Sequence, residues 1–521
     1  MITAAFSAAY LIVAPQSPDL AAASYRSELF SRVGFTLWDN SWYGGHHLLA
    51  YSLLAPALGA LIGPQPLAAI STIIATALFT KVIDGRFPTV ATRAAAVFFA
   101  LGASVALLSS RVPFNLGLAL GLGAVLLVQR RRLVLALVVS VLTALASPVA
   151  GAFLALAFLA WALAGPARGW PLALTIAALA PIALLTLAFP EGGAQPFVAS
   201  AYFPDAAAVL LIAALTGSEP APFGTRVLRI GTLLYAVALT GSYLIPTAVG
   251  GNVDRLGALV AGPVAACVLA GRSRSRLRAL IVLTPFLFYW QATAPVTDFA
   301  STLSNESVNA SFYEPLMDEL HTLGIGYGAR PARIEVVATA DHWEARYVAP
   351  YVMIARGWER QLDTYRNGLF YEGSKPLTAQ RYRAWLEQDA ISYVALPAAP
   401  LDYSARAEAR LVRSGHAGYL HEVWRSPHWR LFAVTGAAPL ASPPGILESA
   451  GSDSLTLYAP RPGSYTVKVH FTPYWALASG RGCVTEAPGG WTEIQAHESG
   501  RFHVVIRFSL GRILSRAPRC S

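Results

Sequence analysis

Residues 113–146 read PFNLGLALGLGAVLLVQRRRLVLALVVSVLTALA. Two apolar runs flank three consecutive arginines, Arg130, Arg131 and Arg132. A helix needs roughly 20 apolar residues to cross a bilayer, and short clusters of basic residues mark the cytoplasmic ends of such helices. The stretch therefore predicts two membrane-spanning helices joined by a cytoplasmic turn.

The same pattern continues on both sides of this stretch. Only 13% of the 521 residues are charged, about half the share of roughly 25% in soluble domains. Residues 1–295 hold 17 basic and 8 acidic side chains, whereas the rest of the chain holds 22 and 21. Basic clusters between long apolar runs are typical of a polytopic membrane protein and not of a nucleic-acid-binding protein. The composition excludes a wholly soluble enzyme and a nucleic-acid partner.

We expect an α-helical membrane domain over residues 1–295 with about eleven spans. The basic cluster Arg272–Arg278 shares the cytoplasmic side with Arg130–Arg132, which places the N-terminus in the cytoplasm and the C-terminal region outside the plasma membrane. Span 2–14 has no basic flank, so it is either an imperfect signal anchor or the start of a longer chain. The expected spans are 2–14, 67–82, 93–109, 113–128, 133–147, 148–164, 170–189, 206–217, 226–247, 255–271 and 279–295.

The apolar stretch Leu48–Ile62 resembles a further span, but counting it would move Arg130–Arg132 to the outside. We expect instead a helix on the outer surface, followed by the linker Gly63-Pro64-Gln65-Pro66. No charged residue lies in the middle of an expected span, where transporters and pumps normally carry ionisable groups. Chemistry is therefore expected at the outer interface.

The first outer loop, within residues 15–66, is the expected catalytic loop. Ser17-Pro18 is a helix start signal and Gly34 a stop signal. Asp19 and Arg26 are seven residues apart, so they share one face of that helix. Aromatic residues suited to the headgroup layer follow: Trp38, Trp42 and Tyr43.

This order of elements resembles the GT-C superfamily, the membrane glycosyltransferases that use polyprenyl-phosphate-linked sugars. The stretch Pro18-Asp19…Tyr25-Arg26…Gly34-Phe35…Trp38-Asp39…Trp42-Tyr43 is similar to the catalytic-subunit loop of oligosaccharyltransferases. No Asp-Asp or Asp-Glu dipeptide is present in this loop, unlike in several members of the superfamily. That departure leaves a divalent metal, Mg²⁺ or Mn²⁺, an open possibility.

The resemblance implies an inverting glycosyltransferase that moves a sugar from a polyprenyl-phosphate carrier to a cell-envelope glycan or lipid acceptor. Asp19 would be the general base, since a positioned carboxylate can take the proton of a sugar hydroxyl as the bond forms. The alternative for Asp19 is stabilisation of a helix N-terminus. A non-catalytic flippase or a glycan-binding assembly factor is the alternative for the whole protein.

Further site candidates lie in the outer loops. Glu191 is a candidate second catalytic acid, and Arg111 and Arg255 with Asn252 are candidates for holding the lipid phosphate. Each arginine could instead touch ordinary lipid headgroups. The remaining substrate-binding candidates are Arg26, Asp39, Tyr43 and His46, where a turn role is the alternative for Asp39 and an interfacial role for His46.

The C-terminal half has the composition of exported soluble domains. Short β-type runs alternate with helical patterns over 301–437, which predicts an α/β domain, and a Pro-rich linker leads to a β-sandwich domain over 445–521. A Cys483–Cys520 disulfide is expected if this part is exported. The polar segments 341–347 and 356–363 either line an acceptor-sugar groove or form a solvated face with ion pairs.

Two further features of the sequence bear on the sugar donor and on the source of the protein. No Walker loop, dinucleotide fingerprint or zinc spacing occurs in the sequence, which disfavours ATP and nucleotide sugars. Lysine occurs only at positions 81, 375 and 468 among many arginines, which indicates a GC-rich bacterial genome.

Overall fold

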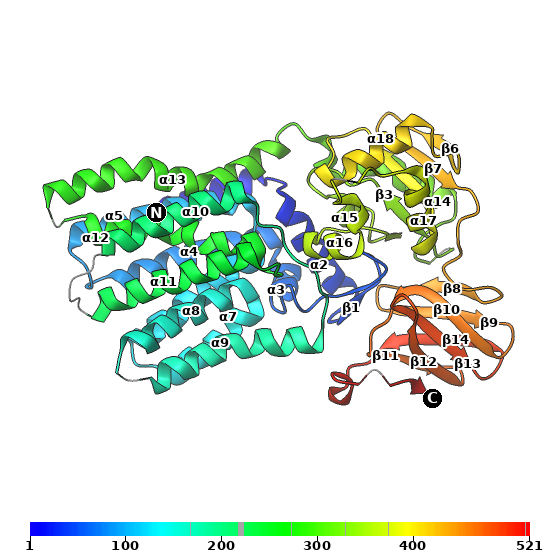
Figure 1. Ribbon diagram of the computed structural model, residues 1–521, viewed down its shortest axis with the longest axis horizontal. Helices are drawn as coiled ribbons and strands as arrows, with labels where there is room; N and C mark the ends of the chain where they lie inside the picture. Colours follow the sequence, from blue (N-terminus) through cyan, green and yellow to red (C-terminus); the bar gives the residue numbers. More distant parts are fainter. Residues whose placement is uncertain are drawn as a thin grey trace. The chain divides into compact units, whose positions relative to one another are not determined.

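The computed structural model describes residues 1–166, 168–216, 223–271, 273–328, 330–373, 375–515 and 517–520. The chain forms two compact units, drawn in Figure 1. The first contains Met1–Glu28, Ala50–Thr186 and Gly192–Leu303, and the second contains Leu29–Leu49, Leu187–Glu191 and Ser304–Ser521. Most of the expected catalytic loop after Glu28 therefore folds with the second unit and not with the membrane helices.

The first unit is built from helices at each of the eleven expected apolar runs. Residue 217 of the run 206–217, and Arg272 of the basic cluster, lie outside the described residues. The helices, with the additional α2 and α3, are α1 (Ile2–Val13), α2 (Pro18–Val33), α3 (Ala55–Ile62), α4 (Pro64–Ile83), α5 (Thr89–Ala106), α6 (Val112–Gln129), α7 (Leu133–Ala146), α8 (Pro148–Ala164), α9 (Gly169–Ala188), α10 (Ala199–Thr216), α11 (Phe223–Leu244), α12 (Asp254–Leu269) and α13 (Arg274–Thr302).

Length and composition make this unit membrane-like. In the described part of the chain, seven helical segments are long and apolar enough to cross a bilayer, and four further apolar helices are shorter. Large apolar side chains point outward on several of them: Leu184, Val237 and Val282 are 66%, 70% and 75% exposed. Such a surface is suited to lipid and not to water. The count of eleven spans and the orientation of the termini stay predictions.

Small residues let the helices of this unit pack closely. A Cβ atom added at Gly117 of α6 would lie 2.7 Å from the Cβ of Ala150 in α8. One added at Gly151 of α8 would lie 2.8 Å from Ala144 in α7. Close approach at glycine and alanine is how helices associate where lipid removes the hydrophobic driving force.

Two local expectations around the first loop differ from the structure. The surface helix expected over 48–62 begins only at Ala55, as α3. The expected linker after Gly63 does not exist, because Pro64 begins α4. Proline is favoured in the first turn of a helix, since the missing N–H would have no partner there. By contrast, α2 begins at Pro18 and ends at Val33, directly before Gly34, as predicted.

The second unit contains a five-stranded sheet in the order β4-β3-β5-β7-β6. Strands β3, β4 and β5 are parallel, and β5, β7 and β6 are antiparallel. The strands are β3 (Arg333–Val336), β4 (Met353–Ile354), β5 (Ile391–Pro397), β6 (Leu420–Arg425) and β7 (Trp429–Val434). The accompanying helices are α14 (Ala310–Thr322), α15 (Glu344–Tyr347), α16 (Arg360–Arg366), α17 (Ala379–Gln388) and α18 (Arg406–Ser414).

Two four-stranded antiparallel sheets follow, in the orders β10-β13-β12-β15 and β11-β14-β9-β8, drawn in orange and red in Figure 1. Inward-facing residues of the two sheets, among them Leu457, Val467 and Val504, share one apolar core. Cys483 of β12 and Cys520 of β15 form a disulfide, the pairing predicted from the sequence. The strands are β8 (Ile446–Ala450), β9 (Ser454–Ala459), β10 (Gly463–His470), β11 (Trp475–Ser479), β12 (Gly482–Ala487), β13 (Trp491–Ala496), β14 (Gly500–Ile506) and β15 (Arg519–Cys520).

Candidate functional site

One arginine of the first unit joins two carboxylates. Nε of Arg111 donates a hydrogen bond to Oδ2 of Asp19 at 3.1 Å, and Nη2 of Arg111 lies 3.7 Å from Oδ2 of Asp298. Asp19 is in the first turn of α2, Arg111 precedes α6, and Asp298 lies near the end of α13. All three side chains are partly exposed, at 18%, 24% and 29%. The cluster is therefore accessible and still partly shielded from solvent.

A tight turn before α6 positions Arg111. Ser110 has a left-handed backbone with φ 51°, and its hydroxyl lies 2.7 Å from the hydroxyl of Tyr10 in α1. The hydroxyl of Ser17 donates to the carbonyl of Ser109 at 3.0 Å, and the hydroxyl of Ser109 donates to Oδ2 of Asp298 at 2.6 Å. The turn is thus fastened to three other helical segments, which fixes where the guanidinium points.

Asp19 keeps one carboxylate oxygen open. Arg111 occupies Oδ2, and within the described residues no hydrogen bond to Oδ1 is formed. An ionised carboxylate oxygen is a hydrogen-bond acceptor only. Asp19 is therefore able to accept a hydrogen bond from an incoming hydroxyl while Arg111 holds it in place.

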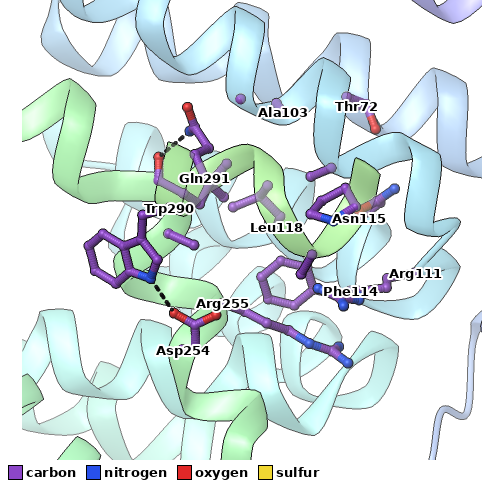
Figure 2. Close-up of a pocket in the computed structure, with 16 residues that line it drawn as sticks. Thr72, Ala103, Arg111, Phe114, Asn115, Leu118, Asp254, Arg255, Trp290 and Gln291 are labelled. Atoms are coloured by element: carbon purple, nitrogen blue, oxygen red, sulfur yellow. Dashed lines mark hydrogen bonds between the residues drawn. The ribbon is translucent and has the colours of Figure 1, made fainter. Parts of the chain in front are cut away.

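A cavity of about 50 Å³ lies among α4, α5, α6, α12 and α13. Figure 2 shows the polar side chains around it. The polar and charged residues that line it include Arg111, Asn115, Asp254, Arg255, Trp290 and Gln291. Most of the rest of the lining is apolar, and the charged and polar side chains within it are notable, since polar groups in membrane segments carry a cost and usually mark a functional site.

Glycines make room for two of the lining side chains. A Cβ atom at Gly102 of α5 would lie 1.6 Å from Nε2 of Gln291. A Cβ atom at Gly257 of α12 would lie 2.6 Å from the ring of Trp290. Trp290 donates a hydrogen bond to Oδ1 of Asp254 at 2.9 Å, as Figure 2 shows. Glycine at both positions is thus required for the observed lining.

Arg255 differs from Arg111 in having no carboxylate bound to it. Its guanidinium lies over the ring of Phe114, 5.6 Å from the ring centre. No hydrogen bond or ion pair of its side chain is formed with any other residue in the described part of the chain. Arg255 also interacts electrostatically with the like charge of Arg111. Two neighbouring guanidinium groups, one of them unpaired, favour an anion between or beside them.

Two further predicted substrate-binding residues, Arg26 and Asn252, belong to the first unit. Arg26 is buried, with its guanidinium 3.9 Å from the ring centre of Tyr51. Asn252 is in the short 3₁₀ helix Gly250–Val253, directly before α12 and Arg255. Their roles in substrate binding stay predictions.

Three predicted substrate-binding residues are buried inside the second unit. Oδ1 of Asp39 accepts a hydrogen bond from the backbone N–H of Ser41 at 3.1 Å, which is the turn role. The hydroxyl of Tyr43 donates to the carbonyl of Glu359 at 3.0 Å. His46 stacks on Trp42, with ring centres 5.3 Å apart. These contacts are those of a packed interior, and the predicted substrate contacts of Asp39, Tyr43 and His46 find no support in them.

Glu191, the candidate second acid, also belongs to the second unit. Oε1 lies 2.7 Å from Nδ1 of His47 and accepts the backbone N–H of His47, and Oε2 lies 3.3 Å from Nη2 of Arg366. Burial opposes ionisation, but the hydrogen bond from His47 and the charge of Arg366 outweigh it, so the pKa of Glu191 is lowered from its ordinary value. The carboxylate is engaged on both oxygens, and a catalytic role for it stays a prediction.

A divalent metal such as Mg²⁺ takes about six oxygen ligands, usually including carboxylates. Within the described ranges no group of three or more His, Cys, Asp or Glu side chains is placed to hold a metal ion. Asp19 and Asp298 instead share the positive charge of Arg111. These residues do not make up a metal site by themselves, so metal dependence stays a prediction.

Three residues of the site are not predicted from the sequence. Asp298 follows the last expected span, 279–295, but α13 continues through Pro295 to Thr302. Trp290 and Gln291 lie within that expected apolar span. A polar residue inside an apolar run is the signal that could have found Gln291, because such residues usually face the interior of a bundle.

Comparisons with known proteins show a structural similarity and no match in sequence. No family model and no curated protein matches this sequence. Among solved structures, the fold is similar to the arabinofuranosyltransferase AftD from mycobacteria, determined by single-particle cryo-EM, with a TM-score of 0.46 and 14% sequence identity. The match covers 98% of this chain and 57% of that chain, so this chain spans little more than half the length of AftD. AftD is a glycosyltransferase, the class of protein that the sequence resembles, but a similarity at this TM-score assigns no activity.

Proposed function

We propose that the protein is an inverting membrane glycosyltransferase. It moves a sugar from a polyprenyl-phosphate carrier to a glycan or lipid acceptor of the cell envelope. The observation that carries the proposal is the presence, in one helical unit, of an accessible carboxylate fixed by Arg111 and of an arginine that binds no carboxylate of the described residues, Arg255, in the lining of a cavity. A base for the acceptor and a ligand for a leaving phosphate are the two groups that such a transfer needs.

Asp19 is the base of the proposed reaction. The acceptor hydroxyl donates a hydrogen bond to Oδ1 of Asp19, and its proton passes to that oxygen as the hydroxyl oxygen bonds to the anomeric carbon. Arg111 holds Oδ2 throughout, at 3.1 Å in the structure. Positioned proton transfer of this kind contributes typically 10²–10⁴-fold to a rate.

Arg255 is the ligand of the leaving group. The bond between the anomeric carbon and the phosphate oxygen breaks as the new bond forms, and negative charge builds on the departing phosphate. A guanidinium can bind two phosphate oxygens at once, which stabilises that charge. Arg111 is already engaged by two carboxylates, so Arg255 is expected to contribute more. Attack opposite the departing phosphate inverts the anomeric configuration.

The alternative is a non-catalytic role as a flippase or assembly factor. The polar lining of the cavity among the helices favours this alternative, because lipid-linked sugars need a polar path through a membrane. The cavity volume of about 50 Å³ disfavours it, since that space holds only a few water molecules.

The test is sugar transfer in proteoliposomes with a panel of polyprenyl-phosphate sugars and envelope-glycan acceptors. Transfer of labelled sugar to an acceptor supports the proposed function. Movement of the intact lipid-linked sugar across the bilayer, without transfer to any acceptor, supports the alternative. Asp84→Asn, an exposed carboxylate that caps α4, is the matched control for every aspartate variant and is expected to behave as wild type.

A further inference from the structure

Arg111 faces a second carboxylate besides that of Asp19. Asp298 in α13 lies on the other side of the same guanidinium, 3.7 Å from Nη2. Oδ2 of Asp298 also accepts the hydroxyl of Ser109 at 2.6 Å, so the carboxylate is held from two directions by the turn that carries Arg111. Asp298 takes no direct part in the proposed reaction.

The geometry decides how Arg111 meets Asp19. A guanidinium can pair with a carboxylate through two parallel N–H groups, and that forked arrangement is the stronger one. Here Asp19 receives only Nε, while Nη2 faces Asp298. The other charges that act on Arg111 or Asp19 are those of Arg255 and Asp254. Removing the charge of Asp298 would leave Arg111 free to form the forked pair with Asp19.

We propose that Asp298 is a positioning residue for Asp19. By holding Nη2 of Arg111 and the hydroxyl of Ser109, it limits the Arg111–Asp19 contact to one hydrogen bond and leaves Oδ1 of Asp19 open to the acceptor. The inference rests on the proposed function for its catalytic meaning, but the arrangement itself is a property of three side chains of the first unit.

Asp298→Asn removes the charge that faces Nη2 of Arg111 and keeps the shape of the side chain. Nη2 is then able to pair with Oδ1 of Asp19, so that oxygen is no longer open to the acceptor.

The test measures Asp19 directly, by labelling with a water-soluble carbodiimide that reacts with protonated carboxyl groups, followed by peptide mass spectrometry. In Asp298→Asn the labelling profile of Asp19 is expected to shift to several-fold lower labelling than in wild type, because both of its oxygens are then engaged by Arg111. Ser109→Ala, which removes only the anchor of Asp298, is expected to shift it in the same direction by less. Asp298→Glu, which keeps the charge, and the control Asp84→Asn are expected to match wild type.

Transfer kinetics supply the second readout. Asp298→Asn is expected to lower kcat roughly 10-fold with little change in KM for the donor, since a positioned base typically contributes 10²–10⁴-fold in all. Arg111→Lys and Asp298→Asn are expected to be non-additive in a double-mutant cycle, because Asp298 acts through Arg111. A loss of thermal stability without a kcat change would show a merely structural role and would overturn the proposal.

The positioning role of Asp298 and the glycosyltransferase function can be disproved independently of each other. Unchanged labelling of Asp19 in Asp298→Asn overturns the positioning role, whatever the transfer assay shows. A shifted labelling profile in a protein that transfers no sugar from any donor supports the positioning role and removes the glycosyltransferase function.

Discussion

Nε of Arg111 lies 3.1 Å from Oδ2 of Asp19, although 92 residues separate the two in sequence. The contact joins the start of α2 to the turn before α6. Arg111 and Arg255 line the same cavity, and among the residues described only Arg111 is bound by carboxylates, which leaves the guanidinium of Arg255 available for a ligand.

The first prediction concerns Arg255. Arg255→Gln removes the charge proposed to contribute most to binding the leaving phosphate, and kcat/KM for sugar transfer is expected to fall roughly 10²-fold, in line with other transition-state charge ligands. Arg255→Lys keeps the charge without the forked geometry, so its kcat/KM is expected to lie between those of wild type and Arg255→Gln. Initial rates in proteoliposomes measure the difference. Equal rates for wild type and Arg255→Gln would remove Arg255 from the site.

The second prediction concerns the turn that carries Arg111. Ser110→Val places a β-branched residue at φ 51° and deletes the hydrogen bond with Tyr10. The two effects together are expected to cost about 2–3 kcal/mol in the free energy of unfolding. Ser110→Asn tolerates the left-handed backbone and is the control. Thermal unfolding in detergent tests this, and similar unfolding temperatures for the two variants would contradict the role of the turn.

Much of the first unit can be predicted from local sequence, because each helix carries its own signals. Ser17-Pro18 and Gly34 bound α2, and every expected apolar run forms a helix. The site is harder. Asp298 lies beyond the expected span 279–295, whereas α13 continues through Pro295 to Thr302.

The second unit shows what local signals leave out. Residues 29–49 were assigned to the membrane half because they follow the first span, yet Asp39, Tyr43 and His46 are buried in the second unit. Only long-range packing determines which unit a loop joins. The polar segments 341–347 and 356–363 hold ion pairs, such as Arg356 with Asp363 at 2.6 Å, but this pair is buried, whereas the predicted alternative was a solvated face.

The third prediction concerns pH and the second unit. Glu335 of β3 and Glu408 of α18 are buried near Arg356, which also pairs with Asp363. Burial raises the pKa of Glu408 to about 7, and burial together with Glu408 raises the pKa of Glu335. Since the folded pKa exceeds the ordinary 4.5, the stability that Glu408 contributes is fully present below about pH 4.5 and is lost as the pH rises through about 7.

Thermal unfolding between pH 5 and pH 8.5 measures this effect. The unfolding temperature of the second unit is expected to fall over that interval in wild type and to depend less on pH in Glu408→Gln, which keeps an acceptor for the hydroxyl of Tyr382. An equal dependence of the unfolding temperature on pH in both proteins would show that Glu335 and Glu408 are not its cause.

The fourth prediction concerns the disulfide between Cys483 and Cys520, which closes a loop of 37 residues and joins β12 to β15. Cys520→Ser is expected to lower the free energy of unfolding by about 2–4 kcal/mol. A reducing agent should destabilise wild type by a similar amount and leave Cys520→Ser unchanged. Cys520→Ser leaves the thiols of Cys483 and of buried Cys267 but no Cys483–Cys520 bond, so sensitivity of the variant to the reductant would show that another group is responsible.

The central claim is that Asp19 is the base of an inverting sugar transfer, and one comparison tests it most directly. Folded Asp19→Asn and wild type are assayed side by side for transfer from a polyprenyl-phosphate sugar, with Asp84→Asn as control. We predict that kcat falls at least about 10²-fold in Asp19→Asn and stays unchanged in the control. Transfer at the wild-type rate by Asp19→Asn would contradict the claim.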